Sequence, residues 1–197
     1  EMCIRDRLFE SVKAKGSFLD SKRVIVTAAP HQSGKDEYLM ILMILALDIE
    51  VCYLSAKWTM RRIPIPFIKP KDIDNQGIPW PLGWLQEIVF RKFGAIPVDR
   101  KGNSGQYDSV VQELFKRDSF LLIITPEGRF DATRFRSSFL YLAKELEAEV
   151  MPVQIDYEHD TLQFLESLNL DGSEDEVIQR LRYCFDGVKG RKSRFKA

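Results

Sequence analysis

Short apolar runs alternate along the chain with longer segments in which apolar side chains recur every three or four residues. A short run rich in β-branched residues is typical of a buried strand, and the longer pattern is typical of a helix with one face in a core. We expect strands at residues 24–29, 51–56, 95–98, 120–125 and 150–155. We expect helices at residues 37–47, 85–91, 106–117, 137–147 and 174–185.

This alternation of strands and helices indicates an α/β fold. We expect a single-domain sandwich in which a largely parallel central sheet is covered by helices on both faces. The near-continuous apolar sequence FLLIIT at residues 120–125 supports this fold, because such strands are buried on both faces. Ligands of these sheets bind beyond the carboxyl ends of the strands. His31, Arg100 and Glu127 each follow a predicted strand at that end.

Residues 58–84 break the alternation. The segment holds five of the nine prolines and all three tryptophans, so we expect a long irregular loop without a central helix or strand. Its Trp, Ile and Pro residues are mixed with Arg and Lys, a composition typical of the headgroup boundary of a membrane. The alternative interpretation is that its aromatic rings pack in the core.

Length and charge limit the class of protein. The 197 residues, 45% of them hydrophobic, fit one domain, which we place at residues 8–188. The 29 basic residues balance the 29 acidic ones, so the net charge gives no argument for a nucleic-acid partner. Residues 189–197 form a basic tail, either solvated or in contact with anionic lipid. Residues 1–7 include MCIRDR, which looks like a translated sequencing adaptor and is excluded from the expected fold.

The cysteines and the apolar runs add two expectations. The three cysteines, Cys3, Cys52 and Cys184, are far apart in the sequence and form no C-x-x-C pair. We therefore expect no disulfide framework and no thiolate metal site, and we expect the protein to reside in a reducing compartment. The longest apolar run, residues 38–49, is shorter than the roughly 20 residues that a membrane-spanning helix needs. It is interpreted as a buried helix.

The sequence PHQSGKD at residues 30–36 invites two interpretations. A phosphate-binding loop needs two glycines, a Lys and then a Ser or Thr at fixed positions. Here Ala29 stands at the position of the first glycine and Asp36 at that of the hydroxyl residue. A carboxylate at that position would also repel a nucleotide phosphate. Nucleotide binding is therefore the weaker interpretation of this segment.

The stronger interpretation is a catalytic pair formed by His31 and Asp36. A His at the end of a strand and an Asp in the first turn of the next helix can approach each other, and a carboxylate on one imidazole nitrogen leaves the other nitrogen free to act as a base. The helix N-terminus beside them favours anionic groups. The second histidine, His159, has no partner at this spacing, and we expect it on the surface.

Three further segments follow strands in the same way. GAIPVDR, residues 94–100, places Arg100 just after a strand, where a guanidinium suits phosphate recognition. TPEGR, residues 125–129, places Glu127 in a Pro-Gly turn after the buried strand. A turn carboxylate that only caps backbone N–H groups is the alternative for Glu127. VMPVQI, residues 150–155, is a strand that Pro152 interrupts.

These four segments, in this order, resemble the phospholipid/glycerol acyltransferase family. PHQSGKD resembles the first conserved block of the family, GAIPVDR the second with its terminal Arg, TPEGR the third, and VMPVQI the fourth with its proline. The resemblance covers residues 23 to about 156. The third block lacks the threonine of the family pattern, so that either Arg129 or Arg134 stands for the family's arginine.

The resemblance implies an O-acyltransferase that moves a fatty acyl group to a hydroxyl of a lysophospholipid or glycerol-phosphate acceptor. His31 would be the general base and Asp36 would orient it. Arg100, Gly94, Glu127, Gly128 and Arg129 would bind substrate. Acyl-CoA or acyl carrier protein would be the co-substrate, with no cofactor and no metal. The protein would be cytoplasmic and peripheral on the inner face of the cytoplasmic membrane. The alternatives are a non-catalytic lipid- or acyl-binding module on the same fold and a nucleotide-binding protein.

Overall fold

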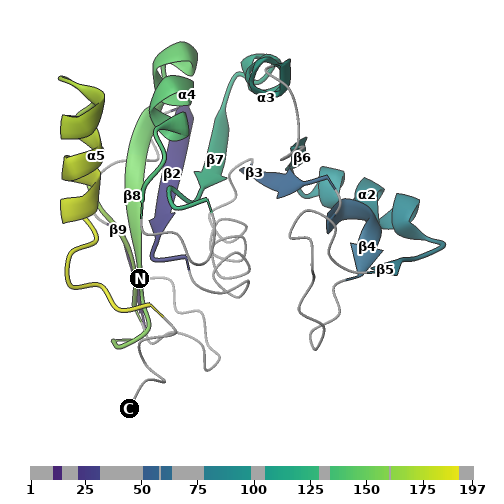
Figure 1. Cartoon of the computed structure of the whole chain (residues 1–197), viewed down its shortest axis with the longest axis horizontal. Coiled ribbons are helices and arrows are strands. Elements are labelled where there is room, and N and C mark those ends of the chain that lie inside the picture. Colours follow the sequence, from purple (N-terminus) through teal and green to yellow (C-terminus); the bar gives the residue numbers. More distant parts are fainter. Residues whose placement is uncertain are drawn as a thin grey trace.

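The computed structural model of the chain is an α/β structure built on one mostly parallel sheet (Figure 1). It describes residues 11–14, 22–31, 51–57, 59–63, 78–98, 105–128, 134–159 and 161–190. The expected helix at residues 37–47 lies outside this part of the chain. The fold class predicted from the sequence is confirmed at the level of an α/β fold with a largely parallel sheet.

The sheet has seven strands in the order β1-β9-β8-β2-β7-β3-β6. The last five strands in this order, from β8 to β6, run parallel to one another. Strand β9 is antiparallel to β8 and parallel to β1. The five expected strands are confirmed as β2 (Arg23–Ala29), β3 (Val51–Ala56), β6 (Ala95–Val98), β7 (Phe120–Ile124) and β8 (Glu149–Asp156). The sequence analysis missed the two short strands β1 (Ser11–Ala14) and β9 (Thr161–Phe164), which extend the sheet beyond β8.

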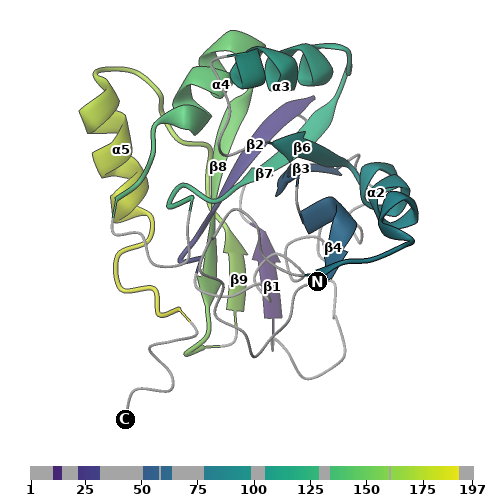
Figure 2. The same cartoon turned by 45° about the vertical axis from the view of Figure 1, so that its right-hand side comes forward.

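Four of the expected helices are confirmed, with ends shifted by at most two residues. They are α2 (Gly83–Lys92), α3 (Gly105–Phe115), α4 (Ser138–Leu146) and α5 (Glu174–Tyr183). Figure 2 shows α3 and α4 over the same region of the sheet, with α5 beside α4. α5 begins with a capping box, because the Ser173 side chain accepts from the Glu176 N–H and the Glu176 carboxylate accepts from the Ser173 N–H.

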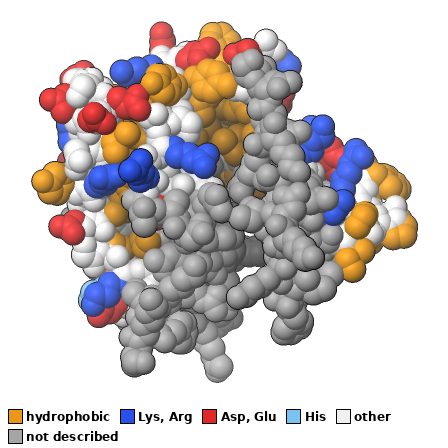
Figure 3. Space-filling model, in the orientation of Figure 1, with side chains coloured by type: hydrophobic (Ala, Val, Ile, Leu, Met, Phe, Trp, Pro, Cys, Tyr) orange, Lys and Arg blue, Asp and Glu red, His pale blue; other side chains and the backbone are white. Residues whose placement is uncertain are grey.

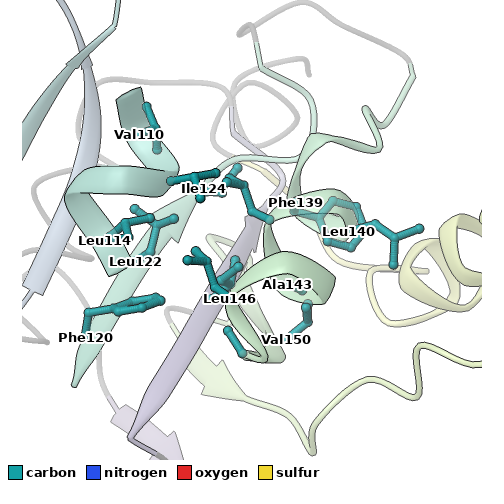
Figure 4. Packing of buried hydrophobic residues seen from close by; sticks show 14 of the residues in the cluster. Val110, Leu114, Phe120, Leu122, Ile124, Phe139, Leu140, Ala143, Leu146 and Val150 are labelled. Carbon is teal, nitrogen blue, oxygen red and sulfur yellow. The ribbon is translucent and has the colours of Figure 1, made fainter. Parts of the chain in front are cut away.

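Both faces of the strand β7 are buried. On one face Phe120, Leu122 and Ile124 pack with apolar side chains of α3, α4 and α5, including Leu114, Phe139 and Leu146 (Figure 4). On the other face Leu121 and Ile123 join a second buried cluster. The alternation of the strand therefore explains its continuous apolar sequence.

The second cluster consists of strand residues and Tyr157, and no described helix contributes to it. The described helices α3, α4 and α5 thus cover one face of the sheet. The expectation of helices on both faces is confirmed for that face, and the helix expected for the other face, residues 37–47, is outside the described residues.

Two expectations about prolines need correction. Pro152 does not interrupt its strand, because β8 runs continuously from Glu149 to Asp156. A proline lacks only the N–H donor, and the Pro152 carbonyl still accepts a hydrogen bond from the Leu165 N–H at 2.9 Å.

The described ends of the proline-rich segment 58–84 are also more ordered than the expected irregular loop, whereas residues 58 and 64–77 lie outside the described part of the chain. A 3-10 turn, η2 (Thr59–Arg61), leads into β4 (Arg62–Ile63), which pairs with β5 (Ile78–Pro79) in a small antiparallel sheet. The first residues of α2, Gly83 and Trp84, also belong to the segment. The prolines are compatible with this because a two-stranded edge needs few N–H donors.

Gly94 makes the connection between α2 and β6 possible. Its φ is +82°, and a Cβ at this position would lie 1.8 Å from the Val51 carbonyl oxygen. Its own carbonyl accepts from the Tyr53 N–H at 3.1 Å. Only glycine fits a backbone that is both left-handed and this close to a neighbouring strand.

We predict that Gly94→Ala lowers the free energy of unfolding by about 3 kcal/mol or more, because left-handed strain and a backbone collision act together. Gly187→Ala is the matched control: Gly187 has a φ of +77° with nothing within 4 Å of an added Cβ. It should lose only about 1–2 kcal/mol from the left-handed φ. Urea unfolding followed by circular dichroism measures both, and equal losses would contradict the account of Gly94.

Candidate functional site

The candidate site lies where two adjacent parallel strands end. β2 ends at Ala29, two residues before His31, and β7 ends at Ile124, three residues before Glu127. The two strands pair in parallel, with Thr27 opposite Ile124, so both ends lie at the same edge of the sheet. This is the edge at which parallel α/β sheets bind their ligands.

A hydrogen bond joins the two strand ends. The main-chain N–H of His31 donates to Oε2 of Glu127 at 2.7 Å, between residues that are 96 positions apart in the chain. His31 is only 5% exposed and Glu127 only 9%. A buried carboxylate needs such donors, because it has lost its hydration. The bond therefore fixes the backbone of residue 31 against the turn that follows β7.

The carboxylate of Glu127 is presented by a tight turn. The Gly128 N–H donates to the Thr125 carbonyl at 3.0 Å, and Gly128 has a φ of +68°. The Pro126 carbonyl accepts from the Arg136 N–H at 2.7 Å, which ties the turn to the segment before α4. The structure thus shows the alternative interpretation for Oε2 of Glu127, which accepts from a backbone N–H. That N–H belongs to His31, two residues after the end of β2.

Arg136 is a site residue that the sequence analysis missed. A Cβ on Gly128 would lie 3.0 Å from the Arg136 Nε, so the guanidinium chain runs directly past the turn. The segment RFR, residues 134–136, offered a second arginine besides Arg134, but periodicity gives no reason to choose between them. Arg134 and Arg136 are both exposed, and Arg129 lies outside the described residues.

The remaining predicted site residues are placed as follows. Asp36 and Arg100 lie outside the part of the chain that the structure describes. The strand before Arg100, β6, ends at Val98 on the same edge as β2, and the Lys57 N–H donates to the Val98 carbonyl at 2.8 Å.

Gly94 is not brought together with His31 and Glu127. It precedes β6 and therefore lies at the amino edge of the parallel strands, next to Val51 at the start of β3. The prediction that Gly94 binds substrate gains no support from this position. The close approach to Val51 gives the glycine a conformational reason instead.

His159 has an acidic partner that the sequence analysis overlooked. Its Nδ1 lies 2.7 Å from Oδ2 of Asp156, three residues earlier, and its side chain is 68% exposed. The surface location expected for His159 is confirmed, and its partner lies at a spacing that the sequence analysis did not consider. The tight turn after β8 brings the two side chains together although the spacing differs from that of His31 and Asp36.

This pair shifts two pKa values in opposite directions. The hydrogen bond and charge of Asp156 raise the pKa of His159 above 6.5. Partial burial acts to raise the pKa of Asp156, but the hydrogen bonds from the His159 side chain and from the N–H groups of Glu158 and His159 outweigh it and lower that pKa. Both shifts favour the ion pair.

Among the described residues, no cluster of three His, Cys, Asp or Glu side chains is arranged to hold a metal ion. The described part of the site offers a buried carboxylate, an anchored histidine and a nearby arginine, a set suited to acid–base chemistry and to recognition of polar groups.

No protein-family model matches the chain, and no curated protein matches it.

We predict that Glu127→Ala lowers the free energy of unfolding by about 1–3 kcal/mol, because it leaves the His31 N–H buried without its acceptor. Glu127→Gln should lose less, since the amide oxygen can accept the same hydrogen bond. Urea unfolding measures the stability, and hydrogen exchange of the His31 amide reports the bond itself. Wild-type stability and wild-type protection in Glu127→Ala would contradict the proposed anchoring.

We predict that His159 titrates above pH 6.5 in an NMR titration of its ring protons, because the charged imidazolium is favoured by Asp156. Asp156→Asn should move the midpoint down towards the value of a free imidazole. His159→Gln should raise the pKa of Asp156, because it removes the hydrogen bond that lowers this pKa most, the one from the imidazole of His159. A midpoint of His159 that does not respond to Asp156→Asn would show that the pair does not form in solution.

Proposed function

We propose that the protein is an O-acyltransferase that moves a fatty acyl group from acyl-CoA or acyl carrier protein to a hydroxyl of a lysophospholipid or glycerol-phosphate acceptor. The proposal includes a fold of the glycerol-phosphate acyltransferase type. It rests on the four sequence segments that resemble the phospholipid/glycerol acyltransferase family. The observation that carries it is the bond between the His31 N–H and the Glu127 carboxylate, because it joins the segments that resemble blocks one and three.

In this proposal His31 is the general base. Its imidazole takes the proton of the acceptor hydroxyl while that oxygen attacks the thioester carbonyl. The new C–O bond forms as the C–S bond breaks, and the same proton then passes from the imidazolium to the departing sulfur. Asp36 holds the imidazole in the tautomer that leaves the reacting nitrogen free. Base catalysis of this kind contributes about 10²–10⁴ in rate.

The proposed substrate contacts divide between two groups. Arg100 grips the phosphate of the acceptor, because a guanidinium binds a phosphate through two parallel hydrogen bonds. Gly128 and Arg129 contact the acceptor beside the turn, where Arg136 offers a further guanidinium. Glu127 is a positioning residue in this proposal. Its Oε2 accepts a hydrogen bond from the His31 N–H, so Glu127 affects the reaction by holding the backbone of the base in place.

The proposed location follows from the substrates. Long-chain acyl acceptors reside in bilayers, so the protein is proposed to work in the cytoplasm as a peripheral protein on the inner face of the cytoplasmic membrane. None of the helices in the described part of the chain combines the length and the apolar composition of a membrane span. A peripheral protein would need another apolar surface to meet the bilayer.

We predict that His31→Ala lowers the rate of acyl transfer by about 10²–10⁴. Thiol release from acyl-CoA or acyl carrier protein, with and without lysophosphatidate, measures the rate. The variant is a clean test because the hydrogen bond to Glu127 uses the main-chain N–H, which alanine retains. His159→Ala is the control: its imidazole is exposed and paired with Asp156, so the rate should stay at the wild-type level.

Transfer that survives His31→Ala would contradict the assignment of the base. A wild-type chain that binds lysophosphatidate but releases no thiol would instead support the non-catalytic lipid-binding module. Mass spectrometry of the products with a panel of acceptors would identify the hydroxyl that receives the acyl group.

A further inference from the structure

The helix α2 carries its apolar side chains on the outside. Seven of the ten large hydrophobic residues that are exposed in the described part of the chain fall between residues 78 and 93. Within α2 and its last turn, Trp84 is 56% exposed, Ile88 44% and Phe93 54%, and Leu85 and Val89 lie on the same side. In a water-surrounded protein this face of a surface helix normally points to the core.

The inward side of α2 carries the polar side chains of Gln86 and Glu87 beside the half-buried Phe90. Gln86 Oε1 accepts from Trp80 Nε1 at 2.8 Å, and Gln86 Nε2 donates to the Arg62 carbonyl at 3.3 Å. The Glu87 carboxylate pairs with Arg61 and, at 3.0 Å, with Arg91. These hydrogen bonds lower the pKa of Glu87, with the bonds from Arg61 and Arg91 as the largest causes. Polar contacts of Gln86 and Glu87 thus help to hold the helix, and most of its large apolar side chains point outward.

We call this surface the α2 face and define it by Ile78, Leu82, Trp84, Leu85, Ile88, Val89 and Phe93. Hydrophobic and basic side chains lie next to each other over α2 and the β4–β5 pair on the right-hand side of Figure 3. An exposed apolar surface of this kind usually marks a contact with another molecule.

The charges around the α2 face identify the kind of partner. Residues 59–63 and 78–98 contain four basic residues (Arg61, Arg62, Arg91 and Lys92) and one acidic residue (Glu87), an excess of three positive charges in a chain whose net charge is zero. Lys92 is exposed on α2 between apolar neighbours, where a long side chain can reach a headgroup while its stem stays in the apolar layer. Trp84 at the start of the helix suits the same boundary.

The α2 face begins at the edge of the sheet that carries the candidate site. β3 ends at that edge and continues towards η2, on which α2 starts: a Cβ on Gly83 would lie 2.7 Å from the Arg61 carbonyl oxygen. α2 ends at Lys92, two residues before Gly94, which lies on the amino edge beside Val51. The apolar face therefore extends from the candidate site along the flank of the sheet.

We propose that the α2 face docks the protein on the surface of a bilayer rich in anionic lipid, with α2 lying in the plane of the headgroups. The inference rests on the proposed function in one respect, the role of the docking. Docking would bring the sheet edge with His31 to the membrane that holds the acyl acceptor. The contact itself follows from the inverted polarity of α2 and its basic surroundings.

Co-sedimentation with sucrose-loaded vesicles tests the docking, using phosphatidylcholine mixed with phosphatidylglycerol against phosphatidylcholine alone. Trp84→Ser combined with Ile88→Ser should lower the partition coefficient on the anionic vesicles at least about tenfold, because two inserted apolar side chains are lost. Tyr183→Ser is the matched control, since Tyr183 is 77% exposed on α5, away from the α2 face. It should bind as the wild type does.

A second pair of variants tests the charge. Lys92→Gln should weaken binding to anionic vesicles about fivefold and leave binding to phosphatidylcholine alone unchanged. Lys116→Gln, at a residue that follows the end of α3, is 74% exposed and is not part of the α2 face, should change neither. Raised salt should weaken the anionic binding in the wild type.

Vesicle binding and catalysis can fail separately. His31→Ala should bind vesicles as the wild type does. A wild-type chain that binds vesicles but transfers no acyl group would defeat the proposed function and leave the docking intact. Unchanged vesicle binding in the folded Trp84→Ser, Ile88→Ser variant would overturn the docking. So would a wild-type dimer that this variant converts to a monomer without loss of vesicle binding, because a second copy would then cover the α2 face.

Discussion

The buried hydrogen bond from the His31 N–H to the Glu127 carboxylate is the contact on which the candidate site depends. It closes a separation of 96 residues with one polar contact at the edge of the sheet. The parallel pairing of β2 and β7 brings the two chain exits together, and the turn through Gly128 aims the carboxylate at the neighbouring strand. Because the bond uses the main-chain N–H, it fixes the position of residue 31 without using the imidazole.

The sheet supplies the rigidity that this contact needs. β2 and β7 are central strands whose side chains are buried on both faces, so the backbone that carries His31 and Glu127 has little freedom. The helix α2 is attached near the same edge in a different way. It is attached through Gln86 and Glu87 and leaves apolar side chains in solvent, which is what a protein needs if its substrate lies in a membrane.

Most of the sheet could be predicted from the sequence, because its strands have strong local signals. The run from Phe120 to Ile124 is apolar throughout, and β3 and β6 were placed at their observed ends. The strand β9 escaped prediction because TLQF offers only four residues with two polar side chains, and its pairing with β8 depends on the tertiary fold.

The site was predictable only in part. The pattern of apolar runs predicted the positions of His31 and Glu127 after parallel strands. It could not predict the bond between them, because the donor is a backbone N–H, which does not depend on the residue type. Arg136 and the His159–Asp156 pair were missed for a related reason: each depends on a turn whose geometry the sequence does not specify. The inverted polarity of α2 was visible as apolar periodicity, and only the structure shows which side faces out.

The pH dependence of kcat/KM for acyl transfer tests the central claim most directly. If the imidazole of residue 31 is the base, the wild-type profile rises through one ionisation as the base loses its proton, and His31→Ala removes that rise together with most of the rate. A His31→Ala profile with the same rise and the wild-type rate would contradict the account.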